Sequence, residues 1–175
     1  MHSEVIPCTK ARHAAAILDI FNDAILTSTA LYDYQLRTLS SMDDWFANKL
    51  KGNFPILGLE NAAGQLIAFG SYGTFRAFPA YKYTVEHSVY VHRDHRKQGL
   101  GLQIMQALIE AAQQNDLHAM IGAIDASNDV SRALHQRLGF QHVGTLPQVG
   151  FKFGRWLDLA FYQLLLSGPQ KPVDG

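Results

Sequence analysis

The chain has 175 residues, of which 47% are hydrophobic and 17% are charged, which suits a single globular domain with a full core. Basic and acidic residues balance at 15 each, so net charge indicates neither a nucleic-acid partner nor an acidic membrane, and a single cysteine excludes an internal disulfide framework and suits the reducing cytoplasm. The sequence has no run of about 18 apolar residues and no basic segment followed by an apolar one at its start, so we expect no transmembrane helix and no signal peptide.

The spacing of apolar residues in the first half predicts three strands and two helices. Residues 4–8 form a short candidate strand, and an apolar stripe within residues 14–25 repeats at helical spacing. Residues 43–50 are expected to form a second, shorter helix. Residues 55–60 and 65–75 predict a hairpin, because the intervening Asn-Ala-Ala-Gly has the residue types that such turns need.

The second half continues the alternation after a central strand at residues 83–92. A helix is expected at residues 101–115, followed by a strand at residues 118–125. The next helix ends at Gly139, which is a good C-terminal stop. Its predicted buried face consists of Val130, Ala133, Leu134 and Leu138.

Two further strands, at residues 140–146 and 155–166, complete the order β-α-α-β-β-β-α-β-α-β-β. This order predicts a mixed α/β fold with a single sheet. Residues 1–166 are expected to form one domain. Residues 167–175 contain two prolines, two glycines and no periodicity, which predicts a loose C-terminal tail.

A basic turn that contains glycines, residues 92–102, separates the central strand from the next helix. A strand, a glycine-bearing turn and a helix N-terminus together present backbone N–H groups to a phosphate. A nucleotide P-loop fits poorly, because Gly101 is followed by Leu102 and Gln103 rather than by Lys and Ser or Thr. A dinucleotide fingerprint fits poorly, because Ile104 stands where a third Gly or Ala is needed.

The remaining pattern, Arg96-x-x-Gly99-x-Gly101, resembles the pyrophosphate-binding loop of the GNAT acyltransferases, which use acetyl-CoA. Residues 128–140 are similar to the segment that follows the fifth strand in that family. Residues 83–91 and 147–158 are similar to its phosphinothricin and methionine sulfoximine N-acetyltransferase group. The resemblance implies the GNAT fold, with a mixed, mostly antiparallel central sheet flanked by helices.

The resemblance implies acetyl transfer from a thioester to an amine, and it makes Glu86 the candidate catalytic base. The amine must lose a proton, directly to Glu86 or through water, before it attacks. On an ideal strand Glu86 shares a face with Thr84 and Ser88. The family places a carboxylate of this strand beside the acceptor amine. The alternative is a structural carboxylate paired with an arginine.

The resemblance also implies where acetyl-CoA binds. Backbone N–H groups of the central strand meet the acetyl group and the pantetheine arm, and the glycines of the basic turn allow close approach to the pyrophosphate. Arg96 and Lys97 add positive charge there, unless they belong to a solvated basic turn. The implied cofactor-binding residues are Val89, Tyr90, Val91, Arg96, Lys97, Gln98, Gly99, Leu100, Gly101, Leu102, Asn128 and Ser131.

His135 is the second candidate catalytic residue. Asn128, Ser131 and His135 are spaced to share a helix face. Many GNAT enzymes have a tyrosine at the position of His135, where it protonates the leaving thiolate. A neutral histidine can donate from one nitrogen, but its ordinary pKa of about 6.5 leaves simple cofactor contact, or an exposed helix histidine, as alternatives.

Arg76 is the candidate anchor for an acceptor carboxylate, which an arginine can bind bidentately; the alternative is a surface arginine. His87 alternates away from Glu86 on an ideal strand, so a bulge would be needed to bring it to the acceptor. His92 and His95 lack a third ligand, so no metal is expected. The implied substrate-binding residues are Arg76, Ala77, Phe78, Glu86, His87 and Ser88.

These features predict an N-acetyltransferase that uses acetyl-CoA in a ternary complex. The implied acceptor is the α-amine of a small amino acid or analogue: methionine sulfoximine, methionine sulfone, phosphinothricin or a free L-amino acid. The family's members are often homodimers, and the aromatic residues 151–156 are candidates for such an interface. Two alternatives stay open, namely acetylation of a peptide N-terminus or a polyamine, and a CoA-binding module without turnover.

Overall fold

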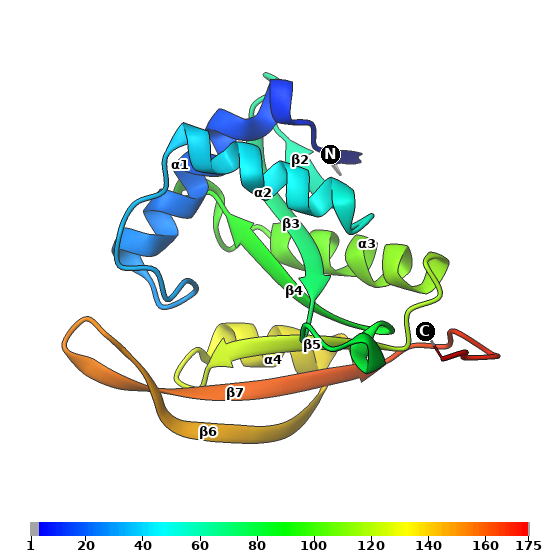
Figure 1. The fold of residues 1–175 in the computed structure, drawn as a ribbon. Coiled ribbons are helices and arrows are strands. Elements are labelled where there is room, and N and C mark those ends of the chain that lie inside the picture. Colours follow the sequence, from blue (N-terminus) through cyan, green and yellow to red (C-terminus); the bar gives the residue numbers. More distant parts are fainter. Residues whose placement is uncertain (1–3, 175) are drawn as a thin grey trace. The chain divides into compact units, whose positions relative to one another are not determined.

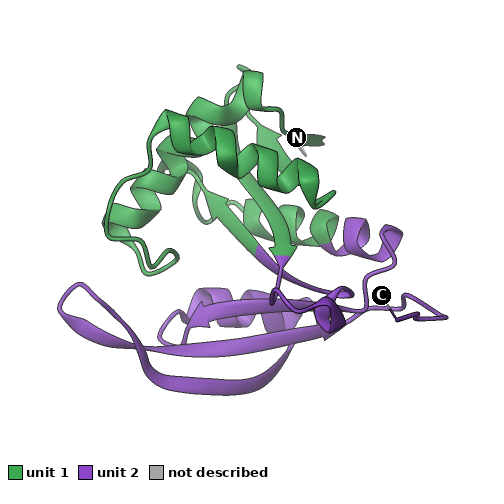
Figure 2. Ribbon diagram, in the orientation of Figure 1, with its two compact units in different colours: residues 1–73, 88–108 green, residues 74–87, 109–175 purple. Residues whose placement is uncertain are grey.

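The computed structural model describes residues 4–174, which fall into two compact units. Unit 1 comprises residues 4–73 and 88–108, and unit 2 comprises residues 74–87 and 109–174 (Figure 2). Strand β4 (Thr84–Val91) and helix α3 (Leu100–Gln114) each have one end in unit 1 and the other in unit 2. The strand order of the sheet is β1-β2-β3-β4-β5-β7-β6.

Unit 1 contains the antiparallel strands β1 (Val5–Pro7), β2 (Ile56–Glu60) and β3 (Leu66–Thr74). It also contains helices α1 (Lys10–Thr27) and α2 (Leu39–Lys51) (Figure 1). The predicted stripe of α1 is buried, as the 3.6-residue period requires, and it joins residues of β2 and β3 in one apolar cluster.

The core of unit 1 is centred on Phe21 of α1. Its ring makes edge-on contacts with Trp45, Phe69 and Tyr90 at centroid distances of 5.4, 5.0 and 5.1 Å. Thr38 caps the first turn of α2, the helix that supplies Trp45. Because Tyr90 belongs to β4, the second half of the central strand is fixed in this aromatic core.

Unit 2 contains β5 (Ala119–Asp125), α4 (Asp129–Arg137), β6 (Gln141–Lys152) and β7 (Arg155–Leu165). Strands β6 and β7 form a long hairpin, and β7 pairs antiparallel with the whole of β5. Three residues at the start of β4 pair in parallel with β5. The 3-10 turns Pro79–Tyr81 and Arg93–His95 lie in the connections before and after β4.

The predicted element order and the mixed α/β class are confirmed, but some details were wrong. Helix α2 begins at Leu39 and not at residue 43. The predicted buried face of α4 is buried only in part: Leu134 and Leu138 are half-buried and Val130 is 83% exposed, whereas His135 is only 4% exposed. Strand β6 reaches Lys152 instead of ending at residue 146. None of the helices within residues 4–174 is both long and apolar enough to cross a membrane.

Candidate active site

Glu86 and Arg76, the predicted base and carboxylate anchor, lie close enough to influence each other. Partial burial raises the pKa of the Glu86 carboxyl above its ordinary value of 4.5, and the charge of Arg76 lowers that pKa in part. Glu86 is half-buried in the last parallel pair between β4 and β5 in unit 2. Arg76 is exposed in the connection before β4, 5.2 Å from the centroid of the Phe75 ring. A carboxylate with a raised pKa beside a cation suits a general base.

Ala77 and Phe78 are exposed in the same connection. The Phe78 side chain is 74% exposed, while Phe75 and Tyr81 brace the connection through an edge-on contact at 5.7 Å. An exposed aromatic ring on a braced turn is available to contact an apolar part of a ligand.

His87, the residue after Glu86, contacts His135 of α4. Their Nε2 atoms are 2.9 Å apart and their ring centroids 5.0 Å apart. The Nδ1 of His135 lies 2.7 Å from the carbonyl oxygen of Ser131, which can only accept, so a neutral His135 carries its hydrogen on Nδ1. His87 therefore donates from Nε2 to His135, and its own Nδ1 is a buried acceptor with no partner within residues 4–174.

The surroundings keep both imidazoles neutral. Burial, helped by the nearby His135, lowers the pKa of His87 to about 3, and burial also lowers the pKa of His135. Gly122 of β5 makes room for the pair, because a Cβ there would lie 2.7 Å from Nε2 of His135 and 2.8 Å from Nε2 of His87. Since the hydrogen of neutral His135 is bound to Ser131, this arrangement favours a positioning role for His135 over donation of a proton to a thiolate.

Asn128 is the N-cap of α4. Its Oδ1 accepts a hydrogen bond from the N–H of Ser131 at 3.0 Å, which leaves its exposed NH₂ group without a partner among the described residues. Ser131 in turn accepts from His135 through its carbonyl oxygen. Two of the predicted cofactor residues are thus linked to His135 through the first turns of one helix.

In unit 1, the basic turn after β4 has a backbone suited to an anion. Lys97 and Gly99 have positive φ angles of 64° and 78°, and the carbonyl of Gly99 accepts from the N–H groups of Leu102 and Gln103 as α3 begins. Gly99 is needed for its φ angle and not for space, since nothing lies within 4 Å of a Cβ built there. A turn of this type, followed by the free N–H groups of a helix start, fits a pyrophosphate.

Arg96 is engaged within the protein. Its Nη2 lies 2.6 Å from Oδ2 of Asp23 on α1, and its Nε donates to the carbonyl of Val91 at 3.4 Å. The neighbouring Lys97 is exposed and makes no ion pair among the described residues. In this structure Arg96 ties the turn to α1, and Lys97 is the side chain available to add charge to a bound phosphate.

Residues 88–91 of β4, which are predicted to meet the cofactor, combine buried and half-buried side chains. Tyr90 is 8% exposed and stacks on Phe69 at 5.4 Å, so its side chain is committed to the core of unit 1. Ser88, Val89 and Val91 are half-buried. A contact of these residues with a ligand would therefore be made mainly through the backbone.

Three features of this region were missed by the sequence analysis: the His87–His135 pair and the side chains of Asp125 and Arg155. The two histidines are 48 positions apart in the sequence, so no local pattern predicts that they pair. Asp125 and Ser127 do carry a local signal, because an aspartate at a strand end with serine two positions later is typical of an Asx turn. No group of three His, Cys, Asp or Glu residues able to hold a metal ion occurs in residues 4–174.

Comparison with known proteins agrees with this geometry. Residues 16–140 match the Acetyltransferase (GNAT) family. An L-methionine sulfoximine/L-methionine sulfone acetyltransferase of Pseudomonas aeruginosa is 48% identical over 151 residues, which are 86% of this chain and 88% of that protein. An acetyltransferase structure from Acinetobacter baylyi superposes with a TM-score of 0.98 at 56% identity, over 99% and 98% of the two chains.

A phosphinothricin acetyltransferase from Sinorhizobium meliloti, solved in complex with acetyl-CoA, has a TM-score of 0.94 at 29% identity and covers 100% of this chain and 95% of its own. These matches confirm the resemblance seen in the basic turn and in residues 128–140. The chain therefore belongs to the GNAT family of acetyltransferases.

Proposed function

We propose that the protein transfers the acetyl group of acetyl-CoA to the α-amine of a small amino acid or analogue. The observation that carries this proposal is the half-buried carboxylate of Glu86, whose pKa is raised by burial and lowered in part by the charge of the exposed Arg76. This pair offers a base for an amine and a cation for a carboxylate, the two groups that every α-amino acid presents together.

The proposed acceptors are methionine sulfoximine, methionine sulfone and phosphinothricin, with ordinary L-amino acids as further candidates. The names of the Pseudomonas and Sinorhizobium relatives support these compounds. The exposed Phe78 ring would line the acceptor side chain. A polyamine acceptor is less compatible, because the cation of Arg76 would repel it.

In the proposed mechanism, Arg76 holds the acceptor carboxylate and Glu86 takes a proton from its ammonium group, directly or through water. The nitrogen then attacks the thioester carbonyl, so that an N–C bond forms and the C–S bond breaks. Of the two protons that the ammonium group loses overall, one neutralises the thiolate and one goes to solvent. Holding both substrates in line supplies a large part of the rate.

For the cofactor, we propose three contacts. The backbone of residues 88–91 meets the acetyl group and the upper pantetheine arm, and the turn 97–102 holds the pyrophosphate. The NH₂ group of Asn128 donates to a pantetheine carbonyl, since its oxygen is already used to cap α4. His87 and His135 remain neutral and fix the position of α4 beside β4.

We further propose a cytoplasmic homodimer. The β6–β7 hairpin exposes Phe151, Phe153 and Trp156 by 45%, 57% and 60%, and a group of exposed aromatic side chains is typical of an interface. A single cysteine suits a reducing compartment.

The test is release of CoA from acetyl-CoA, followed with a thiol reagent, across amino acids, their sulfone and sulfoximine analogues, polyamines and short peptides. We expect turnover on small α-amino acids alone, and a loss of about 10²-fold or more in Glu86→Gln. Glu110→Gln, an exposed glutamate on α3, is the matched control. Turnover on peptides or polyamines would overturn the acceptor, and acetyl-CoA binding with no turnover would indicate a binding module.

A further inference from the structure

Asp125, the last residue of β5, carries a carboxylate that the proposed reaction does not use. Its side chain is only 4% exposed, and both oxygens are bound. Oδ1 accepts from the N–H of Ser127 at 2.9 Å and from its hydroxyl at 2.7 Å, and Oδ2 accepts from Nη2 of Arg155 at 3.1 Å. The backbone carbonyl of Asp125 accepts from the N–H of Asn128 at 2.8 Å. Asp125 thus shapes the tight turn that ends at Asn128.

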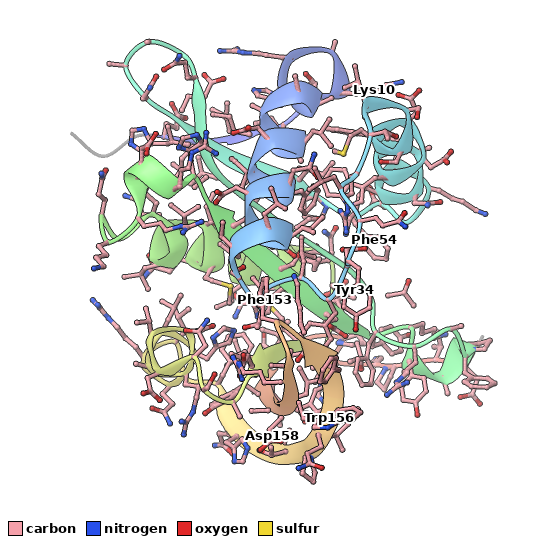
Figure 3. The ribbon with its side chains drawn as sticks, turned by 90° about the vertical axis from the view of Figure 1, so that its left-hand side faces the viewer. Lys10, Tyr34, Phe54, Phe153, Trp156 and Asp158 are labelled. Atoms are coloured by element: carbon pink, nitrogen blue, oxygen red, sulfur yellow. The ribbon has the colours of Figure 1, made fainter. Side chains whose placement is uncertain are left out.

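Arg155 links this turn to the β6–β7 hairpin, where it is the first residue of β7. A second link lies further along β7: the carbonyl of Asp158 accepts from the N–H of Ala126 at 2.9 Å. The carboxylate of Asp158 accepts from the N–H of Gln148 at 2.7 Å in the bulge of β6. Figure 3 labels Asp158 and Trp156 on this hairpin. The turn before α4 is therefore held to β7 by one charge-assisted bond, from Arg155 to Asp125, and by one backbone bond, from Ala126 to Asp158.

We propose that Asp125 and Arg155 are positioning residues, which hold the NH₂ group of Asn128 where it meets the pantetheine arm of acetyl-CoA. The inference rests on the cofactor contact proposed above for Asn128. A neutral side chain at residue 155 would leave the buried carboxylate of Asp125 with one donor fewer, and the turn would lose its tie to β7. The basic turn (residues 92–102) belongs to unit 1, and its backbone makes none of the hydrogen bonds of Asp125, Arg155 and Asp158 described above.

Loss of the Arg155–Asp125 bond should therefore weaken only the binding of the pantetheine arm, which is the part of CoA that reaches Asn128. Isothermal titration calorimetry of the full chain can isolate the pantetheine contribution, because it compares the affinity for CoA with that for ADP, which has the pyrophosphate but no pantetheine. In Arg155→Met we expect CoA to bind roughly tenfold more weakly and ADP to bind as in the wild type. Arg155→Lys keeps the cation and should recover part of the loss. Arg155 is 50% exposed, so its replacement leaves the core intact.

Two further variants sharpen the comparison. Ser127→Ala removes one donor to Asp125 and should give a smaller loss in the same direction. Arg12→Met breaks another arginine–carboxylate pair, Arg12 Nη2 to Glu60 Oε2 at 2.7 Å in unit 1, and should change the affinity for neither ligand. In steady-state assays Arg155→Met should raise KM for acetyl-CoA and leave KM for the acceptor unchanged, a split that general destabilisation would not produce.

Equal losses of CoA and ADP affinity in Arg155→Met, or no loss of either, would overturn the inference. Asn128→Asp distinguishes that failure from a failure of the proposed contact, because aspartate keeps the oxygen that caps α4 and lacks the NH₂ group. If Asn128→Asp binds CoA as tightly as the wild type, the pantetheine contact is wrong and the inference falls with it. If Asn128→Asp loses CoA affinity while Arg155→Met does not, the contact stands and the positioning inference alone is wrong.

Discussion

Two opposed influences set the protonation of the proposed base. Burial raises the pKa of Glu86, and the charge of Arg76 partly offsets that rise. A base works only when deprotonated, so the pKa of Glu86 fixes the acid limb of the pH profile of kcat/KM. Arg76 should therefore affect catalysis in two separable ways: its charge lowers the pKa of Glu86, and its guanidinium binds the acceptor carboxylate.

Arg76→Gln should move the acid limb of kcat/KM to higher pH, because removal of the cation lets the pKa of Glu86 rise further. It should also raise KM for the amino acid by roughly tenfold, since one charged hydrogen-bonding partner is lost. The acid limb of kcat/KM and the KM for the amino acid are both obtained from initial rates measured across pH at several acceptor concentrations.

Arg76→Lys is the matched control, because lysine keeps the charge and loses the planar fork. Its acid limb should stay near that of the wild type, while KM for the acceptor should still rise. An acid limb that stays in place in Arg76→Gln would show that Arg76 does not influence the base.

Single residues differ in how much of their chemistry the sequence reveals. Glu86 and Gly99 stand in local patterns, and Gly99 indeed has the positive φ that a phosphate turn requires. The tautomer of His135 is different, because it depends on Ser131 one helical turn away and on His87 across the fold. Sequence alone therefore left proton donation and cofactor contact as equal readings of one histidine.

At the scale of elements, α2 is joined to the end of β3 by Lys49, a half-buried lysine. Nζ of Lys49 donates to the carbonyl of Tyr72 at 2.8 Å and lies 5.7 and 5.8 Å from the ring centroids of Trp45 and Phe54. Among residues 4–174 it has no carboxylate partner. Burial accordingly lowers the pKa of Lys49 to about 8.

This lowered pKa predicts a stability change in alkaline solution. Between about pH 8 and 10.4, the unfolded chain holds a proton on Lys49 that the folded chain has released, so stability rises with pH. The stability of the wild type relative to Lys49→Met should therefore increase from pH 7 to pH 10, by at most about 1.4 kcal/mol per pH unit. Urea unfolding of both proteins at several pH values measures it.

Lys51→Met, an exposed lysine on the same helix, serves as the control and should follow the wild type at every pH. A constant difference between the wild type and Lys49→Met would mean that the ammonium of Lys49 is solvated in the folded protein and not buried.

Elements were predicted well where their pattern is local and poorly where distant partners decide. The α1 stripe and the β2–β3 hairpin follow from periodicity and turn residues. Strand β6 was expected to end at residue 146, but it runs on through Pro147 to Lys152. It continues because the shift in register between Leu146 and Gly150 is held by Asp158 of the facing strand.

Helix α4 shows the same limit. Its apolar residues suggested a buried face through Val130 and Leu138, yet Val130 is exposed and His135 is buried. The missing side chain of Gly122 leaves the space that receives His135, and the imidazole of His87 is its hydrogen-bond partner there. Hydrophobicity alone cannot place a histidine inside, because one of the two hydrogen bonds that offset its burial comes from His87, 48 positions away.

At the scale of the whole molecule, the β6–β7 hairpin shows where apolar surface remains after folding. Every residue of β6 but Lys152 is exposed or half-buried, although the strand carries several apolar side chains. Those on the hairpin with large exposed areas are Val143, Leu146, Val149, Phe151, Phe153, Trp156 and Leu165. The rings of Phe151 and Trp156 pack edge-on at 5.1 Å, which gives a preformed aromatic contact of the kind that anchors interfaces.

If this surface is the interface of the proposed homodimer, Trp156→Ser should dissociate it. Truncating a central aromatic anchor removes about 2 kcal/mol or more of binding free energy, which is at least a tenfold loss of affinity. Sedimentation velocity over a concentration series should show the wild type as a dimer and Trp156→Ser shifted toward monomer at the same concentrations. Leu26→Ser on α1, where the leucine is 61% exposed, is the matched control and should remain dimeric. A wild type that stays monomeric throughout the series would contradict the dimer, and the exposed rings would then have to serve another partner or the acceptor itself.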